Sequence, residues 1–146
     1  EPHFTLARNI RRLIDAEFGR TVTKAVKHTP HAQLRSVQER LEARFPDEYG
    51  ATAAAKFRSH EDIAADQLFH YYGQLSGHAV ASTIRYDYVN IANMAYTPNL
   101  VNLSQLRDRD VFCLNDAPGD VHEPMDDDAV NAFLTSYFPV PSRFER

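Results

Sequence analysis

The sequence has little cysteine, no tryptophan and no long apolar run. Its one cysteine, Cys113, cannot form a disulfide within the chain, and a reducing compartment is the simplest interpretation. No stretch approaches the roughly 18 consecutive apolar residues that a membrane-spanning helix needs, and no apolar signal core opens the sequence. We therefore expect a soluble, cytoplasmic chain.

Positive charge is not in excess either. Sixteen Lys and Arg stand against 20 Asp and Glu, so the net charge of −4 gives no global field that would attract nucleic acid or an anionic membrane. The length of 146 residues and the apolar content of 43% predict a single compact region over 1–146 and exclude disorder as its main state. Seven histidines would raise the formal charge from −4 to +3 if all were protonated.

Apolar residues at helical spacing predict two helices near the start of the chain. The first runs from about 5 to 18, with Thr5 as its N-cap and Gly19 just after its end. Thr29 and Pro30 resemble the N-cap and first position of the second. Its expected buried stripe is Leu34, Val37, Leu41 and Phe45.

Pro46 ends that second helix, and a short helix or turn is expected over 47–55. Ser59, followed three residues later by Asp62, resembles a capping box at the start of a third long helix that continues to Gly77. The expected apolar positions of that helix are Ile63, Leu68, Tyr71, Tyr72 and Leu75.

The second half of the chain reads as strands alternating with helices. A strand is predicted over 83–89, a short helix over 99–106, a buried strand over 111–114 and a loop over 115–125. A last helix would run from its cap at 126 to 138, with Val130, Phe133, Leu134 and Tyr137 inward. Helices therefore dominate, with a few strands.

His28 and His31 bracket the expected helix start, where free N–H groups and the helix dipole favour an anion such as phosphate. The structural alternative is that they only cap and solvate the helix. Arg58 has the chemistry of a phosphate clamp, since a guanidinium binds phosphate oxygens bidentately, but on spacing alone a salt bridge to Glu61 or Asp62 is the better interpretation. A zinc site is disfavoured because Cys113 has no cysteine partner.

Polar residues also follow the expected strand over 111–114. Asn115 and Asp116 lie where ligand groups gather at the strand ends of α/β sheets, although a turn pair would look the same. Three acids at 126–128 suggest a metal cluster, but helix capping and the dipole explain them, and we interpret them as structural.

Taken in order, these segments resemble the Stealth family, which includes bacterial capsule polysaccharide phosphotransferases and the catalytic subunit of the lysosomal-enzyme N-acetylglucosamine-1-phosphotransferase. Segments similar to the family's third block are His28-Thr29-Pro30-His31, Phe45-Pro46-Asp47-Glu48-Tyr49, Phe57-Arg58-Ser59-His60-Glu61-Asp62 and Tyr71-Tyr72. Those similar to its fourth block are Phe112-Cys113-Leu114-Asn115-Asp116 and Tyr137-Phe138-Pro139-Val140-Pro141-Ser142-Arg143-Phe144-Glu145. The family's first and second blocks are missing, so the chain resembles the C-terminal part of a larger α/β phosphotransferase domain.

The resemblance implies transfer of a hexose 1-phosphate, such as GlcNAc-1-P or Glc-1-P, from a UDP-sugar to an acceptor saccharide. It implies that His28 is the catalytic acid or base, that Arg58 holds the diphosphate and that His31 orients His28 or a phosphate. His60, Asp62 and Asn115 are expected to bind substrate. Asp116 is expected to be catalytic and to bind Mg²⁺ or Mn²⁺, since oxygen ligands and substrate phosphates suit these ions.

The expected partners are the nucleotide-sugar donor, the acceptor saccharide and the remaining N-terminal part of the catalytic domain, in the cytoplasm or peripheral at the inner membrane. Two other functions stay open. A helical accessory module would bind glycan or donor without chemistry, with Tyr86, Tyr88 and Tyr96 stacking on sugar rings. A histidine-dependent metal hydrolase is supported only by the number of histidines.

Overall fold

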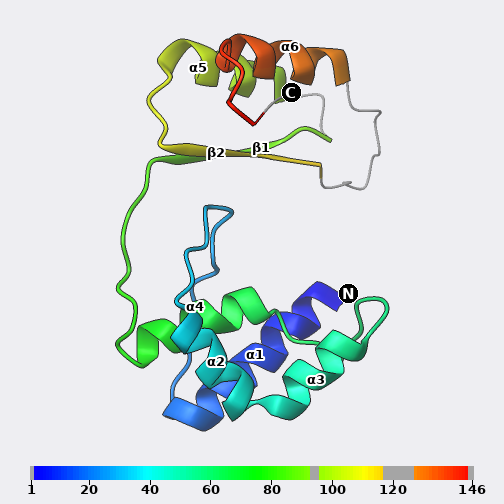
Figure 1. Cartoon of the computed structure of the whole chain (residues 1–146), viewed down its shortest axis with the longest axis vertical. Helices are drawn as coiled ribbons and strands as arrows, with labels where there is room; N and C mark the ends of the chain where they lie inside the picture. The colour runs from blue at the N-terminus through cyan, green and yellow to red at the C-terminus, as the bar shows by residue number, and fades with distance from the viewer. Residues whose placement is uncertain (1, 93–95, 117–126, 145–146) are drawn as a thin grey trace. The chain divides into compact units, whose positions relative to one another are not determined.

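The computed structural model describes residues 2–92, 96–116 and 127–144 (Figure 1). By their contacts the residues group into two compact units, Glu1–Ser82 and Thr83–Arg146, and each is described by itself. Helices dominate over strands in the described residues, as the sequence predicts. None of the helices described is both long and apolar enough to cross a membrane.

The first unit is built from four helices. They are α1 (Pro2–Phe18), α2 (Arg35–Arg44), α3 (Pro46–Ala54) and α4 (Ala65–Leu75). Residues one turn apart on α1 and α2 face the same side and close over α4, which gives the expected core. Its most deeply buried side chains are Ile10, Ile14, Val37, Leu41 and Leu68, each fully shielded from solvent. Gly19 ends α1 at a positive φ of 63°, where a glycine carries no steric penalty.

The predicted start of the second helix is wrong. The N–H of Thr29 bonds the Lys27 carbonyl in a tight turn, and α2 begins only at Arg35, after Leu34 in an extended conformation. Leu34 is consequently 55% exposed and does not join the buried stripe. Pro46 does end α2, but it also opens α3, because proline fits the first turn of a helix.

The predicted start of the third long helix is also wrong. Ser59 and Asp62 do bond each other, but they close a turn in the loop before α4, which begins at Ala65. Thr5, the expected N-cap of the first helix, lies inside α1, which begins at Pro2. Gly77 follows the end of α4 at a φ of 76°, as expected.

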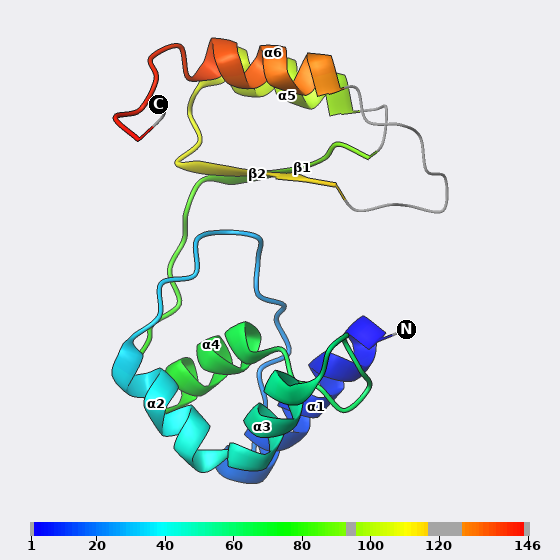
Figure 2. The same cartoon turned by 45° about the vertical axis from the view of Figure 1, so that its right-hand side comes forward.

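The second unit is a β–α–β arrangement followed by a helix. The strands β1 (Tyr86–Asn90) and β2 (Val111–Asn115) are parallel, with α5 (Thr97–Leu106) between them in the chain and α6 (Asp127–Tyr137) after them. Figure 2 shows α5 and α6 together on one face of the two strands. Their core contains Val89, Ile91, Tyr96, Leu100, Leu103, Val130, Phe133 and Tyr137.

Three details of this unit differ from expectation. The strand β2 is half-buried along its length rather than buried, and Leu134 is only partly buried. Tyr96 is 4% exposed and belongs to the core, so it is unavailable for stacking on a sugar. The expected helix cap at 126 and most of the 115–125 loop lie outside the described residues.

Candidate functional site

His28 and His31 lie in the connection between α1 and α2, in a turn held at one carbonyl. The Lys27 carbonyl accepts a hydrogen bond from the N–H of Thr29 at 2.9 Å, and Nε2 of His31 lies 2.8 Å from the same oxygen. His28 is the middle residue of this three-residue turn, and its side chain is exposed. The turn therefore presents the His28 imidazole toward solvent on a fixed backbone.

His31 also contacts α4. Its Nδ1 lies 3.7 Å from a carboxylate oxygen of Asp66, and its ring meets the ring of His70 edge to face with centroids 4.7 Å apart. Burial, and then the neighbouring His31, lower the pKa of His70, while Asp66 opposes that shift. His70 is therefore a neutral imidazole near pH 7. The sequence analysis did not identify either Asp66 or His70.

Arg58 and Asp66 line one hollow at the start of α4, with a volume of about 360 Å³. The other residues around it are Leu6, Ala7, Ile63, Ala64, Ala65 and Gln67. Asp66 therefore lines the same hollow as Arg58, one of the expected phosphate-binding residues, and also faces His31. Among the residues that line the hollow, Arg58 is the one with a positive charge and Asp66 the one with a negative charge. Attraction for a phosphate-bearing ligand would therefore come from Arg58.

The loop that carries Arg58 is fixed at several points. The Asp62 carboxylate, 5% exposed, accepts hydrogen bonds from the N–H and the hydroxyl of Ser59 at 2.7 and 2.8 Å. Asn9 of α1 donates to the carbonyls of His60 and Asp62 at 2.9 and 3.0 Å. The His60 ring is exposed, with Nδ1 3.4 Å from the Thr5 hydroxyl. Asp62 thus stabilises the conformation of the loop that carries Arg58, whereas the His60 ring is exposed to solvent.

In the second unit, two asparagines end the parallel strands side by side. Asn90 and Asn115 are register partners, and the N–H of Ile91 bonds the Asn115 carbonyl at 3.0 Å. Asp116 follows directly and is exposed. The carboxyl edge of a parallel sheet is where ligands usually bind, so Asn115 and Asp116 lie where expected. The sequence analysis did not identify Asn90, which directly follows the strand predicted over 83–89 and ends β1 in the structure.

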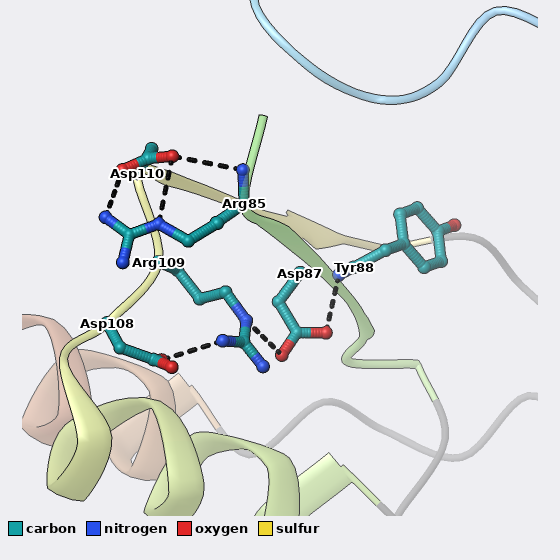
Figure 3. A network of polar contacts seen from close by, with 6 residues as sticks. All are labelled: Arg85, Asp87, Tyr88, Asp108, Arg109 and Asp110. Carbon is teal, nitrogen blue, oxygen red and sulfur yellow. Dashed lines mark hydrogen bonds and ion pairs between the residues drawn. The ribbon is translucent and has the colours of Figure 1, made fainter. Parts of the chain in front are cut away.

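The opposite end of these strands carries a network of ion pairs (Figure 3). Arg85 binds Asp110 at 2.7 Å, and hydrogen bonds from its guanidinium and its N–H lower the pKa of the Asp110 carboxyl. Arg109 lies 3.6 Å from Asp87 and 2.8 Å from Asp108. These charges are paired with one another, so this edge is a poor candidate for a phosphate site.

Over the described ranges, no three His, Cys, Asp or Glu side chains are grouped as a metal ion would require. The histidine-dependent metal hydrolase gains no support from this part of the chain. Asp116 supplies one carboxylate, which suits Mg²⁺ or Mn²⁺ only when substrate phosphates and water complete the coordination.

Comparison with known families gives one match within each unit. A model of Stealth protein conserved region 3 matches residues 27–74, and a model of conserved region 4 matches residues 102–146. The chain belongs to the Stealth family. His28, His31, Arg58, Asp66 and His70 all fall within the Stealth region 3 match. Asn115 and Asp116 fall within the Stealth region 4 match.

Three curated Stealth relatives from Streptomyces coelicolor are named exopolysaccharide phosphotransferases. One is 40% identical over 100% of this chain and 16% of its own length. The second is 38% identical over 95% of this chain and 24% of its own length. The third is 35% identical over 95% of this chain and 26% of its own length. The chain therefore spans between about a sixth and about a quarter of the length of these relatives.

Proposed function

We propose that the natural protein transfers a hexose 1-phosphate from a UDP-sugar to a hydroxyl of an acceptor saccharide, in the synthesis of a capsule or another cell-surface polysaccharide. GlcNAc-1-P and Glc-1-P are the groups we would test first. The family and the names of the relatives support a sugar phosphotransferase. The observation that carries the proposal is the link from the Arg58 hollow through Asp66 to His31 and the turn that presents His28.

In this reaction the acceptor oxygen attacks the phosphorus next to the donor sugar. A new P–O bond to the acceptor forms, the bond between this phosphorus and the oxygen bridging to the UMP phosphate breaks, and UMP leaves. His28 takes the proton of the acceptor hydroxyl, a role that suits an exposed imidazole. Arg58 neutralises the oxygens of the diphosphate, where negative charge is greatest. His31 orients His28.

Each unit has its own candidate binding residues: the loop around Arg58 in the first unit and the carboxyl edge of the β strands in the second. His60 has an exposed ring close to Arg58 in the chain and would contact the donor or the acceptor. Asp62 would act through the loop, because both of its carboxylate oxygens bond Ser59. Asn115 would bind donor oxygens at the carboxyl edge of β2.

Asp116 would hold the divalent ion. Its exposed carboxylate and the neighbouring Asn115 amide are oxygen ligands of the kind that Mg²⁺ and Mn²⁺ prefer. When bound, such an ion neutralises phosphate charge and assists departure of UMP. Because the described residues contain no group of three metal-ligating side chains, donor phosphates would supply further ligands.

Calorimetric titration tests the proposal. UDP-GlcNAc and UDP-glucose, each with Mg²⁺ or Mn²⁺, are titrated into the 146-residue chain and into the full-length natural protein. We expect the full-length protein to bind one of them, and Arg58→Ala to abolish that binding. Arg35→Ala is the matched control, because Arg35 is an exposed arginine of α2 paired with Glu39. Failure of folded full-length protein to bind either donor would contradict the proposal.

The accessory-module alternative makes a different prediction in the same experiment. Tyr88 is 38% exposed on β1 and could stack on a sugar ring. A module of this kind would bind glycan whether or not Arg58 is present, and it would release no UMP. Glycan binding that survives Arg58→Ala but is lost with Tyr88→Ala would favour it over the transferase.

A further inference from the structure

The connection between α1 and α2 is held by α4 at two separate points. The Tyr71 hydroxyl, on a side chain only 4% exposed, donates to the Lys24 carbonyl at 3.0 Å. Further along the same connection, His31 lies against Asp66 and His70. Since Lys24 and His31 flank His28, α4 fixes the backbone on both sides of it.

Asp66 and His70 are four residues apart on α4, so their side chains lie one turn apart on the same side of the helix. His31 sits against both of them. The carboxylate of Asp66 faces Nδ1 of His31, and the rings of His70 and His31 meet edge to face. This leaves Nε2 of His31 directed at the Lys27 carbonyl, which it meets at 2.8 Å.

We propose that Asp66 and His70 are positioning residues that act on His28 through His31. They fix the His31 ring, His31 fixes the Lys27 carbonyl, and that carbonyl closes the turn whose middle residue is His28. The proposal rests on the proposed function, because it assigns these residues to the same transfer reaction. Its structural part, the hold on the turn, is measurable without any substrate.

The two residues act in different ways. Asp66 acts by charge. Nδ1 and Nε2 of His31 each face an oxygen, so both contacts are attractive when each nitrogen carries a hydrogen, the form that the carboxylate favours. His70 acts by the shape of its ring, because its buried Nε2 has no hydrogen-bond partner among the described residues. A buried nitrogen without a partner costs stability, so polar bonding does not explain a histidine there. The ring contact with His31 does.

The experiment measures hydrogen exchange and steady-state kinetics in the full-length natural protein. The variants are Asp66→Ala, the milder Asp66→Asn, His70→Ala and His70→Phe. The matched control is His78→Gln, because His78 is an exposed histidine of the same unit that contacts Ser76 and Arg40. Circular dichroism confirms that each variant folds, and Asp66→Asn replaces Asp66→Ala if the latter does not.

We expect the alanine variants to speed amide exchange over residues 27–31 and to lower kcat by about 10- to 100-fold with little change in KM, as a small misplacement of a reacting group does. His70→Phe should recover most of the protection and the rate, because it restores a ring beside His31. Unchanged exchange over 27–31 in both alanine variants would overturn the proposal, as would a fall in kcat without any change in exchange. If the wild-type protein transfers no sugar phosphate, the proposed function is wrong. The exchange rates over residues 27–31 still show whether Asp66 and His70 stabilise the turn.

Discussion

The imidazole of His70 on α4 meets the imidazole of His31 with ring centroids 4.7 Å apart, so a proton on one ring raises the cost of a proton on the other. Burial is the larger cause of the lowered pKa of His70, and the carboxylate of Asp66 partly offsets both effects. The first prediction follows from this relationship.

Stability should fall at mildly acidic pH, in part through His70. Its pKa in the folded protein lies below the ordinary value of 6.5, so the unfolded chain takes up the proton first. Stability that is fully present above pH 6.5 is therefore lost as the pH falls through the folded pKa. Thermal melting of wild type and His70→Phe at about pH 7.5 and pH 5.5 measures this contribution. Wild type should lose more Tm between the two conditions; an equal or larger loss in His70→Phe would contradict the prediction.

The position of the start of α2 can be tested with two identical substitutions. Leu41→Ala removes a fully buried side chain and should lower the free energy of unfolding by about 2–5 kcal/mol. Leu34→Ala, at an exposed position, should change it by less than about 0.5 kcal/mol. Urea denaturation of both variants gives the comparison. Similar losses would mean that Leu34 is buried, as the sequence pattern suggested.

Asp62 should matter for the Arg58 loop. Asp62→Ala leaves the N–H and the hydroxyl of Ser59 without their acceptor and should lower the free energy of unfolding by about 1–3 kcal/mol. Glu61→Ala, at the exposed neighbouring position, should change it by less than about 0.5 kcal/mol. Chemical denaturation followed by circular dichroism measures both. If Asp62→Ala is as stable as wild type, the structural role is wrong, and a direct role of this carboxylate in substrate binding is favoured instead.

Arg107 should tie the ends of α5 and α6 together. Its guanidinium donates to the Tyr137 carbonyl at 2.7 Å and lies 4.2 Å from the centre of the Tyr137 ring. Arg107→Ala should lower the free energy of unfolding by about 1–2 kcal/mol, since it removes both contacts while the backbone stays at a positive φ. Gln105→Ala, at an exposed position of α5, serves as the control in the same denaturation experiment. A loss no larger than that of the control would refute this role.

Most of the helices could be predicted because their apolar residues recur at helical spacing, as Ile10 and Ile14 do on α1. Their starts were harder, because a local hydrogen bond looks the same in a turn and at a helix cap. Ser59 and Asp62 form the bonds of a capping box without a helix after them. Thr29 and Pro30 are compatible with a helix start, but the N–H of Thr29 instead closes the turn with the Lys27 carbonyl.

The candidate site was predicted in part. His28, His31 and Arg58 carry functional groups in a segment similar to a known family, and all three belong to one unit that the Stealth region 3 model matches. Asp66 and His70 could not be found, because their importance depends on a contact with His31 across some 35 to 39 positions of sequence, which spacing does not reveal. The roles of these residues and of Asn115 and Asp116 stay predictions.

The most direct test of the account is UMP release by the full-length natural protein, given a UDP-sugar, Mg²⁺ and an acceptor saccharide. Wild type should release UMP as the acceptor gains a phosphodiester. His28→Ala should reduce the rate by about 100- to 10,000-fold, as loss of a general base does, while Arg35→Ala retains it. Near-normal turnover by folded His28→Ala would remove His28 from the chemistry and contradict the account.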